Sequence, residues 1–409
     1  MTVVMSSCRC GFSRAALCGG RTAARARQQR FGPGQRDRLA ALYGRSSMHL
    51  NSLTARNLRI LTSVELTVDA DLVVFSGPNG SGKSSLLEAI HILGTGRSFR
   101  ARSVQDVISR GQDTLLVRAE FSKPSGGRGA LAIEKPRQGS ARFRLDGEAV
   151  ATASELARQL PLVFISADSQ RLLSDGAEMR RRQLDWLMFH VEPNYQQLFA
   201  RYRRALGQRN ALLRQNGAGN RDEQMAWVQE MAVAGEQLHA LRQQRLLVAE
   251  PILQAALKDL GSIDLEFVYK AGWDTEKTLA DVLHSAWEAD RSRGYSGYGP
   301  HRADLQFMVG GRPAQHVVSR GEGKVLVFAV LVAFAKVLAS SVQVRPLMLV
   351  DELASELDGV NRERFLAALR ELQMQTFITT VSQDLVNPSG WGRVCLCSLS
   401  QGEVVQVLQ

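Results

Sequence analysis

The chain has 409 residues, with 51 Lys or Arg against 40 Asp or Glu, so its formal net charge is +11. A hydrophobic fraction of 44% and a charged fraction of 22% exclude a chain that is disordered throughout and a collagen-like chain. Five cysteines with no CxxC pair exclude a disulfide framework and give no indication of a zinc site. This length predicts about two or three domains.

The positive charge is concentrated at the start of the chain. Residues 1–47 hold nine arginines, no lysine and one acidic residue, Asp37, so their net charge is +8 and the other 362 residues carry +3. We expect this segment to be a disordered basic leader, because it has no sustained apolar period. It is interpreted as an arm that touches nucleic acid, as an organelle targeting peptide, or as a translated upstream stretch with the natural start at Met48. The last interpretation is favoured, because a patterned strand follows at once.

Nothing in the pattern indicates a secretory signal or a membrane span. The leader lacks a long apolar region, and the most apolar run elsewhere, Val325–Ala335, ends at Lys336. That run is too short to cross a bilayer and predicts a buried helix. We therefore expect a cytoplasmic protein without a membrane partner.

Strand and helix patterns alternate through most of the rest. Strands are expected at Leu50–Ile60, Asp71–Ser76, Leu115–Phe121, Leu131–Glu134, Arg142–Leu145 and Leu162–Ser166, with a helix at Ser84–Leu93. After Gly299 the pattern predicts helices at Val325–Leu338 and Arg362–Leu372, strands at Leu347–Val350 and Thr376–Val381, and a closing hairpin at Val394–Leu408.

The middle of the chain has a different character. From about Glu178 to Lys258 we expect helices, among them Tyr195–Gln215 and a second one that follows the turn 216–220. The second helix is predicted from an apolar stripe of Trp227, Met231, Ala234, Leu238, Leu241, Val248 and Ile252, broken at Arg245. We therefore predict a head split into residues 48–160 and 295–409, with an inserted helical lobe over residues 161–294.

A phosphate-binding loop follows the second strand. Residues 77–84, Gly-Pro-Asn-Gly-Ser-Gly-Lys-Ser, match GxxxxGK[ST] and lie between a predicted strand and a predicted helix. Such a loop turns successive backbone N–H groups toward phosphate oxygens, and the helix N-terminus adds partial positive charge. Lys83 is expected to reach the β and γ phosphates of ATP, and Ser84 to bind Mg²⁺. The expected nucleotide-binding residues are Gly77, Pro78, Asn79, Gly80, Ser81, Gly82, Lys83, Ser84 and Ser85.

An acidic pair ends the strand Leu347–Val350. Asp351 is expected to hold Mg²⁺ directly or through water, and Glu352 to orient or deprotonate the attacking water. The alternative, acidic residues at the solvent end of a strand, is weakened by the presence of the phosphate loop. The expected catalytic residues are thus Lys83, Asp351 and Glu352, and the expected metal ligands are Ser84 and Asp351.

Two further segments resemble those of ABC-type ATPases. Val318–Glu322 resembles the signature loop, whose Ser319, Arg320 and Gly321 are then expected to bind nucleotide, and Ser355–Asp358 resembles the D-loop. The resemblance implies an α/β fold, an ABC-type P-loop ATPase head. It also implies that the signature of one subunit closes on the γ-phosphate held by another, so that ATP joins two heads and hydrolysis releases them.

This sequence departs from the superfamily pattern at three places. The carboxylate of Glu322 is unexpected next to phosphate. No switch histidine is present near Thr379–Ser382, and the Q-loop glutamine is not evident in Leu160–Ser166.

Six further segments occur in a set order along the chain: Gly77–Ile90, Leu93–Arg100, Met179–Trp186, Phe189–Pro193, Tyr298–Leu305 and Asp351–Asp358. Together they resemble the RecF family of bacterial recombination and repair proteins, from about Met48 to the C-terminus. The resemblance implies an SMC-like head without a long coiled coil, which dimerises with ATP on double-stranded and gapped DNA and hydrolyses ATP slowly. It also implies help in loading the RecA recombinase at single-strand gaps, with RecO and RecR as partners, in DNA replication, repair, recombination and the SOS response.

Three other functions stay open. A transporter's nucleotide-binding subunit is disfavoured by the helical insert and by the missing switch histidine. A small-molecule P-loop kinase is disfavoured by the signature and the D-loop. The last alternative is an ATP-binding switch without meaningful turnover.

Basic residues of the helical lobe are the candidate DNA contacts. Phosphate contacts by such residues would position the protein without selecting a sequence. The alternative is a solvated helix face balanced by nearby acids. Tyr295, Tyr298, His301 and Arg302 could stack or clamp, although ordering the return of the chain to the head is the favoured interpretation. The candidates are Arg180, Arg181, Arg182, Arg201 and Arg204, with Arg203, Arg209 and Arg214 beside them.

Overall fold

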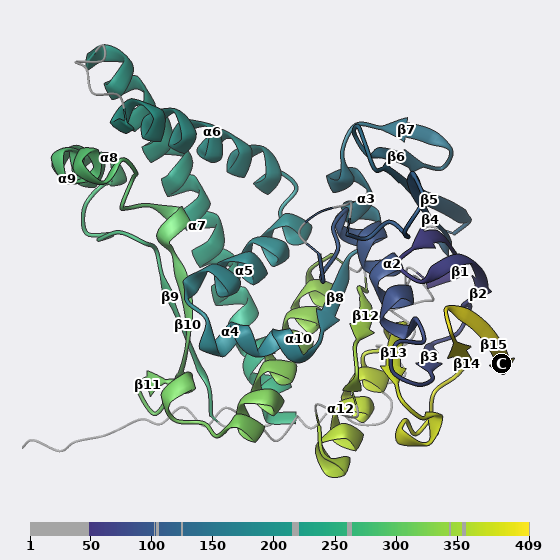
Figure 1. Ribbon diagram of the computed structural model, residues 1–409. Coiled ribbons are helices and arrows are strands. Elements are labelled where there is room, and N and C mark those ends of the chain that lie inside the picture. The colour runs from purple at the N-terminus through teal and green to yellow at the C-terminus, as the bar shows by residue number, and fades with distance from the viewer. Residues whose placement is uncertain are drawn as a thin grey trace, which may run out of the picture. The chain divides into compact units, whose positions relative to one another are not determined.

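The computed structural model describes residues 49–101, 103, 106–123, 126–214, 221–259, 264–342, 345–353 and 357–408 (Figure 1). The leader 1–47, Met48, the turn 216–220 and the D-loop residues Ser355 and Glu356 lie outside this range.

One sheet of the described chain carries both the phosphate loop and the acidic pair. Its strand order is β15-β14-β3-β13-β12-β8, in which β15 is antiparallel to β14 and all other neighbours are parallel. Because parallel strands end at one edge, the segments after β3 and β12 meet there. The strands are β3(Leu72–Ser76), β8(Leu162–Ile165), β12(Leu347–Val350), β13(Thr376–Thr380), β14(Val394–Ser400) and β15(Glu403–Leu408).

Helices cover both faces of this sheet, so its central strands are apolar on both sides. Alternate residues face different cores: Val73 and Phe75 pack with α2(Lys83–Thr95), whereas Leu72 and Val74 pack with α10(Arg320–Val342). The same alternation places Leu347 and Leu349 with α2, and Met348 and Val350 with α10. The two helices therefore lie on opposite faces of the sheet.

A second, antiparallel sheet packs on the α2 side. Its order is β2-β1-β4-β5-β6-β7, and Leu53 and Val117 of this sheet share a core with Leu86 of α2. The helix α3(Ala153–Gln159) follows, and a Thr152–Glu155 capping box begins it. The strands are β1(His49–Leu58), β2(Leu61–Thr67), β4(Thr114–Ser122), β5(Arg128–Pro136), β6(Arg142–Leu145) and β7(Glu148–Val150).

The helical lobe contains a small sheet as well as helices (Figure 1). The strand order of this sheet is β11-β10-β9. Its elements are η1(Ala167–Gln170), α4(Arg171–Ser174), α5(Ala177–Val191), α6(Tyr195–Arg214), α7(Arg221–Asp259), β9(Glu266–Lys270), α8(Leu279–Ser285), α9(Trp287–Arg293), η2(Pro300–Arg302), β10(Asp304–Val309), β11(Arg312–Pro313) and η3(Ala314–His316). The helix α12(Gly359–Glu371) and η4(Gln383–Leu385) belong to the last part of the chain.

Both expected boundaries of the lobe are wrong. The strand β8 pairs with β12 in the central sheet, so the first part of the head extends beyond residue 160. The strand β10 pairs with β9, so residues 304–309 belong to the lobe rather than to the second part of the head. Both boundaries are decided by which strands pair with each other. A change in the pattern of the sequence does not reveal this pairing.

The apolar stripe predicted on the second lobe helix is wrong at Val248, whereas Leu241 and Ile252 pack against the same core as the first half of the stripe. Met231, Ala234 and Leu238 are buried as expected, but Val248 is 54% exposed and Arg242 is only 1% exposed. Arg242 donates to the Asp185 carboxylate at 2.5 Å and to the Pro300 carbonyl at 3.0 Å. The buried guanidinium of Arg242 thus lies one helical turn after Leu238, where an apolar side chain would be expected, and its partner Asp185 is only partly buried.

A second buried ion pair holds α6 against the segment that leads back to the head. Arg209 and Asp290 have fully buried side chains and are 2.8 Å apart. Arg209 also donates to the Ser296 hydroxyl at 2.7 Å and to the Leu283 carbonyl at 3.0 Å. Removing one partner of such a pair leaves an uncompensated buried charge, at a cost of about 3–5 kcal/mol. Arg209 is therefore structural and not part of a basic surface.

The apolar run Val325–Ala335 forms a buried helix, as predicted, but the helix is longer than expected. Among the described helices only Arg320–Ser341 is long and apolar enough to cross a membrane, and 72% of its most apolar stretch is buried inside the protein. Its position in the core explains its apolar composition.

Protonation of His301 should destabilise the fold. Its Nε2 lies 2.9 Å from the Ser296 carbonyl and so carries the proton, which leaves Nδ1 to accept from the Tyr202 hydroxyl at 2.6 Å. Burial lowers the pKa of His301 to about 4, so the unfolded chain takes up a proton first as the pH falls. Stability is therefore full above pH ~6.5 and is lost down to pH ~4, by about 3 kcal/mol for this residue.

The variant His301→Gln tests this expectation, because an amide can accept from Tyr202 and donate to Ser296 without titrating. Urea unfolding of both proteins between pH 7 and pH 4.5 should show a smaller loss of unfolding free energy in the variant. Equal losses would show that other groups cause the acid destabilisation.

Candidate active site

The phosphate loop has a backbone that only glycine tolerates at two points. Gly77 has φ +147, and a Cβ there would lie 2.3 Å from the Leu399 carbonyl oxygen. Gly82, the N-cap of α2, has φ +108, and a Cβ there would lie 2.9 Å from the Leu61 side chain. These conformations let the chain enter α2 with its first N–H groups free to face an anion. The loop thus has the local geometry predicted for residues 77–84.

Lys83 lies inside the loop. Its side chain is 3% exposed, and its ammonium group donates to the Gly77 carbonyl at 2.8 Å and to the Pro78 carbonyl at 3.0 Å. The same nitrogen is 3.6 Å from a carboxylate oxygen of Glu352. The structure therefore brings together two of the three predicted catalytic residues.

Asp351 joins the start of α2 to two neighbouring strands of the central sheet. Its Oδ1 accepts from the Ser84 hydroxyl at 2.9 Å and from the Thr379 hydroxyl at 2.7 Å. The Thr379 hydroxyl in turn accepts from the backbone N–H of Glu352 at 2.8 Å. One threonine thereby fixes both the carboxylate of Asp351 and the backbone of Glu352.

The role of Thr379 is not visible in the sequence. The register pairs Val350 with Ile378, so the next residues, Asp351 and Thr379, lie side by side. The sequence draws attention to Thr379 only as part of the segment 379–382, which has no switch histidine. A hydroxyl residue one position beyond the paired end of the adjacent strand is the signal that could have identified it.

Glu352 has an uncommon backbone conformation. Its φ is +57, which is rare outside glycine, asparagine and aspartate. Such strain occurs often at functional sites, where surrounding contacts hold it in place. The bond from its N–H to Thr379 is one such contact, and it directs the side chain, 33% exposed, toward Lys83.

This group of residues fits ATP with Mg²⁺. The Ser84 hydroxyl and the Asp351 carboxylate are adjacent oxygen ligands, and Mg²⁺ in proteins usually takes one or two such ligands together with substrate phosphates. Bound Mg²⁺ would supply charge neutralisation at the phosphates. Lys83 would hold phosphate, and Glu352 would position water.

The signature segment begins α10 through a capping box. The helix begins at Arg320, earlier than expected, and Ser319 precedes it. The Ser319 N–H donates to the Glu322 carboxylate at 2.8 Å, and the Glu322 N–H donates to the Ser319 hydroxyl at 3.3 Å. These bonds lower the pKa of Glu322. The unexpected carboxylate is therefore explained, because it caps a helix N-terminus.

Asp358 of the D-loop segment also caps a helix. Its carboxylate accepts from the backbone N–H of Asn361 at 2.9 Å, in the first turn of α12. Ser355 and Glu356 lie outside the described residues, so the rest of this segment stays a prediction.

A glutamine missed in the sequence lies beside the signature helix. The strand β8 is adjacent to the site, because the Asp351 N–H donates to the Ile165 carbonyl at 2.8 Å. Gln170 follows in η1, and its amide oxygen would lie 3.6 Å from a Cβ built on Gly323. Its amide nitrogen is buried and has no hydrogen-bond partner among the described residues. The feature of the sequence that could have identified Gln170 is its position shortly after β8, a strand that ends at the site.

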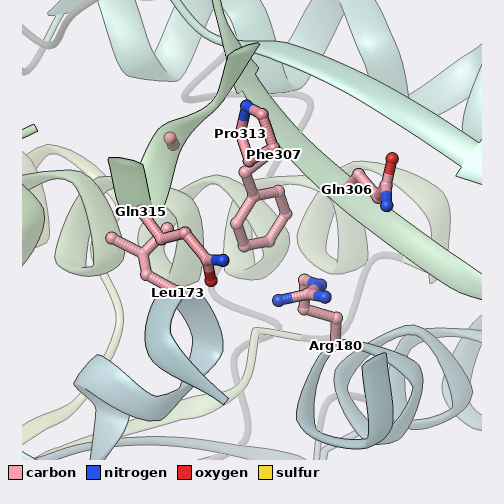
Figure 2. Close-up of a pocket in the computed structure, with 7 residues that line it drawn as sticks. Leu173, Arg180, Gln306, Phe307, Pro313 and Gln315 are labelled. Carbon is pink, nitrogen blue, oxygen red and sulfur yellow. The ribbon is translucent and has the colours of Figure 1, made fainter. Parts of the chain in front are cut away.

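Two of the five predicted DNA contacts have internal partners. Arg180 binds both carboxylate oxygens of Asp304, at 2.8 and 3.0 Å, and Arg181 donates to the Ala303 carbonyl at 2.7 Å. Figure 2 shows the Arg180 side chain reaching from α5 toward Phe307 of β10, where it lines a cavity of ≈ 100 Å³. The prediction for Arg180 is therefore corrected: its guanidinium joins α5 to the small sheet.

The other three candidates are exposed. Arg182 pairs with Glu178 and Arg201 with Glu230, so nearby acids balance both charges. Arg204 is exposed on the same helix as Arg201. As DNA contacts these three stay predictions.

Replacing Thr379 by valine should impair hydrolysis. The variant keeps the shape of the side chain but removes both bonds that position Asp351 and Glu352. We expect ATP turnover to fall by about 10–100-fold, as for other residues that orient metal ligands, with a higher Mg²⁺ requirement. Nucleotide affinity measured without Mg²⁺ should change little.

The matched control is Thr380→Val, because the Thr380 hydroxyl donates to the Ser382 carbonyl and not to a site carboxylate. If both variants turn over ATP like the parent protein, the Thr379 bond is not required.

Removing the Glu322 cap should loosen the start of α10. Glu322→Ala cannot accept the Ser319 N–H, whereas Glu322→Gln can. Hydrogen exchange of the first-turn amides of α10 should be several-fold faster in the alanine variant and close to normal in the glutamine variant. Equal protection in both would contradict the capping role.

Comparison with known proteins agrees with this geometry. The model of the RecF/RecN/SMC N terminal domain family matches residues 49–395. The "DNA replication and repair protein RecF" of Stutzerimonas stutzeri is 37% identical over 88% of this chain and 98% of the relative, and that of Pseudomonas syringae pv. tomato is 36% identical over the same shares.

Solved structures support the fold. A structure of "the recombination mediator protein RecF-ATPrS in RecFOR pathway" has a TM-score of 0.80 at 23% identity and covers 90% of this chain and 100% of that one. An SMC head bound to the C-winged helix domain of ScpA has a TM-score of 0.54 at 15% identity and covers 88% of this chain and 98% of that one. The predicted α/β fold, an ABC-type P-loop ATPase head, is confirmed. The chain belongs to the RecF family.

Proposed function

We propose that this chain is an ATP-dependent DNA-binding protein of recombinational repair, which dimerises on DNA with ATP and is released by slow, DNA-dependent hydrolysis. One observation carries the proposal: Ser84, Asp351 and Glu352 meet around Lys83 at one edge of the sheet. This arrangement suits Mg-ATP. Relatives named DNA replication and repair proteins supply the DNA part.

The placement of the signature supports a dimer. It begins α10, on the face of the sheet opposite to α2, so the two helix N-termini of one chain do not cover the same face. A second copy could bring its Ser319, Arg320 and Gly321 to the phosphates held by the first. Gly321 is open, because a Cβ built there meets nothing within 4 Å.

The finer steps extend the same proposal. Double-stranded and gapped DNA would be the ligands, with Arg182, Arg201 and Arg204 as phosphate contacts. RecO and RecR would be partners in loading the RecA recombinase at single-strand gaps, in the cytoplasm. The support is membership of the RecF family and the RecFOR pathway for which the solved RecF structure is named. Family membership disfavours the transporter and kinase alternatives.

Sedimentation of the full chain with gapped DNA, with and without Mg-ATP, tests the proposal. ATP should double the sedimenting mass and tighten DNA binding, and log affinity should fall with log salt by roughly 0.9 for each phosphate contact. Lys83→Met should weaken ATP binding and therefore dimerisation. If ATP changes neither mass nor DNA affinity, the proposal fails.

A Gly321→Glu variant distinguishes ATP binding within one chain from dimerisation through the signature. The new carboxylate points into open space in its own chain and toward phosphate in a dimer. ATP binding and folding should stay intact while the ATP-dependent dimer disappears, and Gly321→Ala is the matched control. Normal dimerisation of Gly321→Glu would exclude a signature that acts on the other subunit.

A further inference from the structure

A second concave site lies in the helical lobe, on elements that the ATP site does not use. It is a cavity of ≈ 690 Å³ between α7, the end of β9, the turn 271–275 and the segment 298–304. None of its lining residues belongs to the phosphate loop, the acidic pair or the signature. Its function must therefore be derived from its own residues.

Aromatic rings form one wall of this cavity. His239 and Tyr269 stack with their ring centroids 5.7 Å apart and an interplanar angle of 17°. Trp273 meets His239 edge-on at 5.1 Å, and Tyr298 lines the cavity with 39% of its surface exposed. Rings held by one another in this way form a rigid stacking surface.

The floor of the cavity is fixed by close backbone contact. Gly272 has φ +94 and accepts from the Gly299 N–H at 3.1 Å, and a Cβ at Gly272 would lie 2.3 Å from the Gly299 carbonyl oxygen. Only glycine allows the turn 271–275 and the segment 298–304 to come this close. The shape of the site is thus built into the chain.

Charge and hydrogen-bonding groups at the cavity suit a nucleotide. Lys270 and Arg302 line it, and the Arg302 guanidinium is held 5.1 Å from the Tyr295 ring. Of the two carboxylates, Asp304 is neutralised by Arg180, which leaves Asp274. His239 Nδ1 is buried without a hydrogen-bond partner among the described residues, and burial lowers the pKa of His239, so its ring is neutral.

We propose that this cavity binds an unpaired base of single-stranded DNA, stacked on Trp273 and Tyr298, with Lys270 and Arg302 on the adjacent phosphates. Stacking needs an exposed base face, which a duplex does not offer. The inference rests on the proposed function, because it adds a single-strand site to a DNA-binding protein.

The test uses the full chain and a short labelled oligothymidylate, with a duplex as the second ligand and fluorescence anisotropy as the readout. Trp273→Ala and Tyr298→Ala should each weaken oligothymidylate binding about tenfold, and Trp273→Phe should restore most of it. Duplex affinity and the ATP response should stay unchanged. Leu247→Ala, which removes a side chain 67% exposed on α7 outside the cavity, is the control.

Photocrosslinking with 5-iodouracil in the oligonucleotide gives an independent readout, and the label should map to Trp273 or Tyr298. Thermal unfolding confirms that the variants fold, and Tyr298→Ala removes a partly exposed ring. Unchanged oligothymidylate binding, equal losses for single strand and duplex, or crosslinks only elsewhere would overturn the inference. In each of these cases the parent protein still binds duplex DNA and responds to ATP, whereas absence of both in the parent protein would contradict the proposed function itself.

Discussion

The carboxylate of Asp351 is the contact on which the arrangement of this site depends. One oxygen accepts from Ser84, at the start of α2, and from Thr379, at the end of β13, while its own backbone N–H binds the end of β8. Four segments that are distant in the sequence are thus positioned by one residue at the edge of the sheet. The strained backbone of Glu352 is held by the same threonine, so the placement of the Asp351 carboxylate and of the residue facing Lys83 cannot vary independently.

The parts of this site that depend on local sequence were predictable, and those that depend on strand pairing were not. The phosphate loop and the acidic pair follow from residue type and from position between a strand and a helix. Thr379 acts only because β12 and β13 pair with Val350 opposite Ile378, and a single sequence does not contain that register. Residues 319–322 also match Ser-x-x-Glu, the pattern of a capping box, although the resemblance to an ABC signature loop predicts a nucleotide contact for the same segment.

The partners of the basic residues could not be predicted from the sequence either. Arg180 and Arg182 lie two residues apart in one basic run, yet Arg180 binds Asp304, 124 residues away in sequence, and Arg182 is exposed on the surface. Arg209 and Arg242 likewise lie in helices with an amphipathic pattern and are buried against Asp290 and Asp185. A basic cluster in sequence therefore overestimates the positive surface, because burial is decided by where distant acids lie.

The capping box explains why the carboxylate of Glu322 can lie in a segment that is expected to face phosphate. A free glutamate at that position would repel an anion, but the Glu322 carboxylate is drawn to the Ser319 N–H and to the partial positive charge of the helix N-terminus. The negative charge of Glu322 is thus compensated at the helix N-terminus. Gly321 has no side chain, and the space beside its backbone is open. Since α10 lies on the opposite face of the sheet from α2, this backbone and the start of α2 do not cover the same face. The ATP-dependent dimer proposed above rests on this separation of the two helix N-termini within one chain.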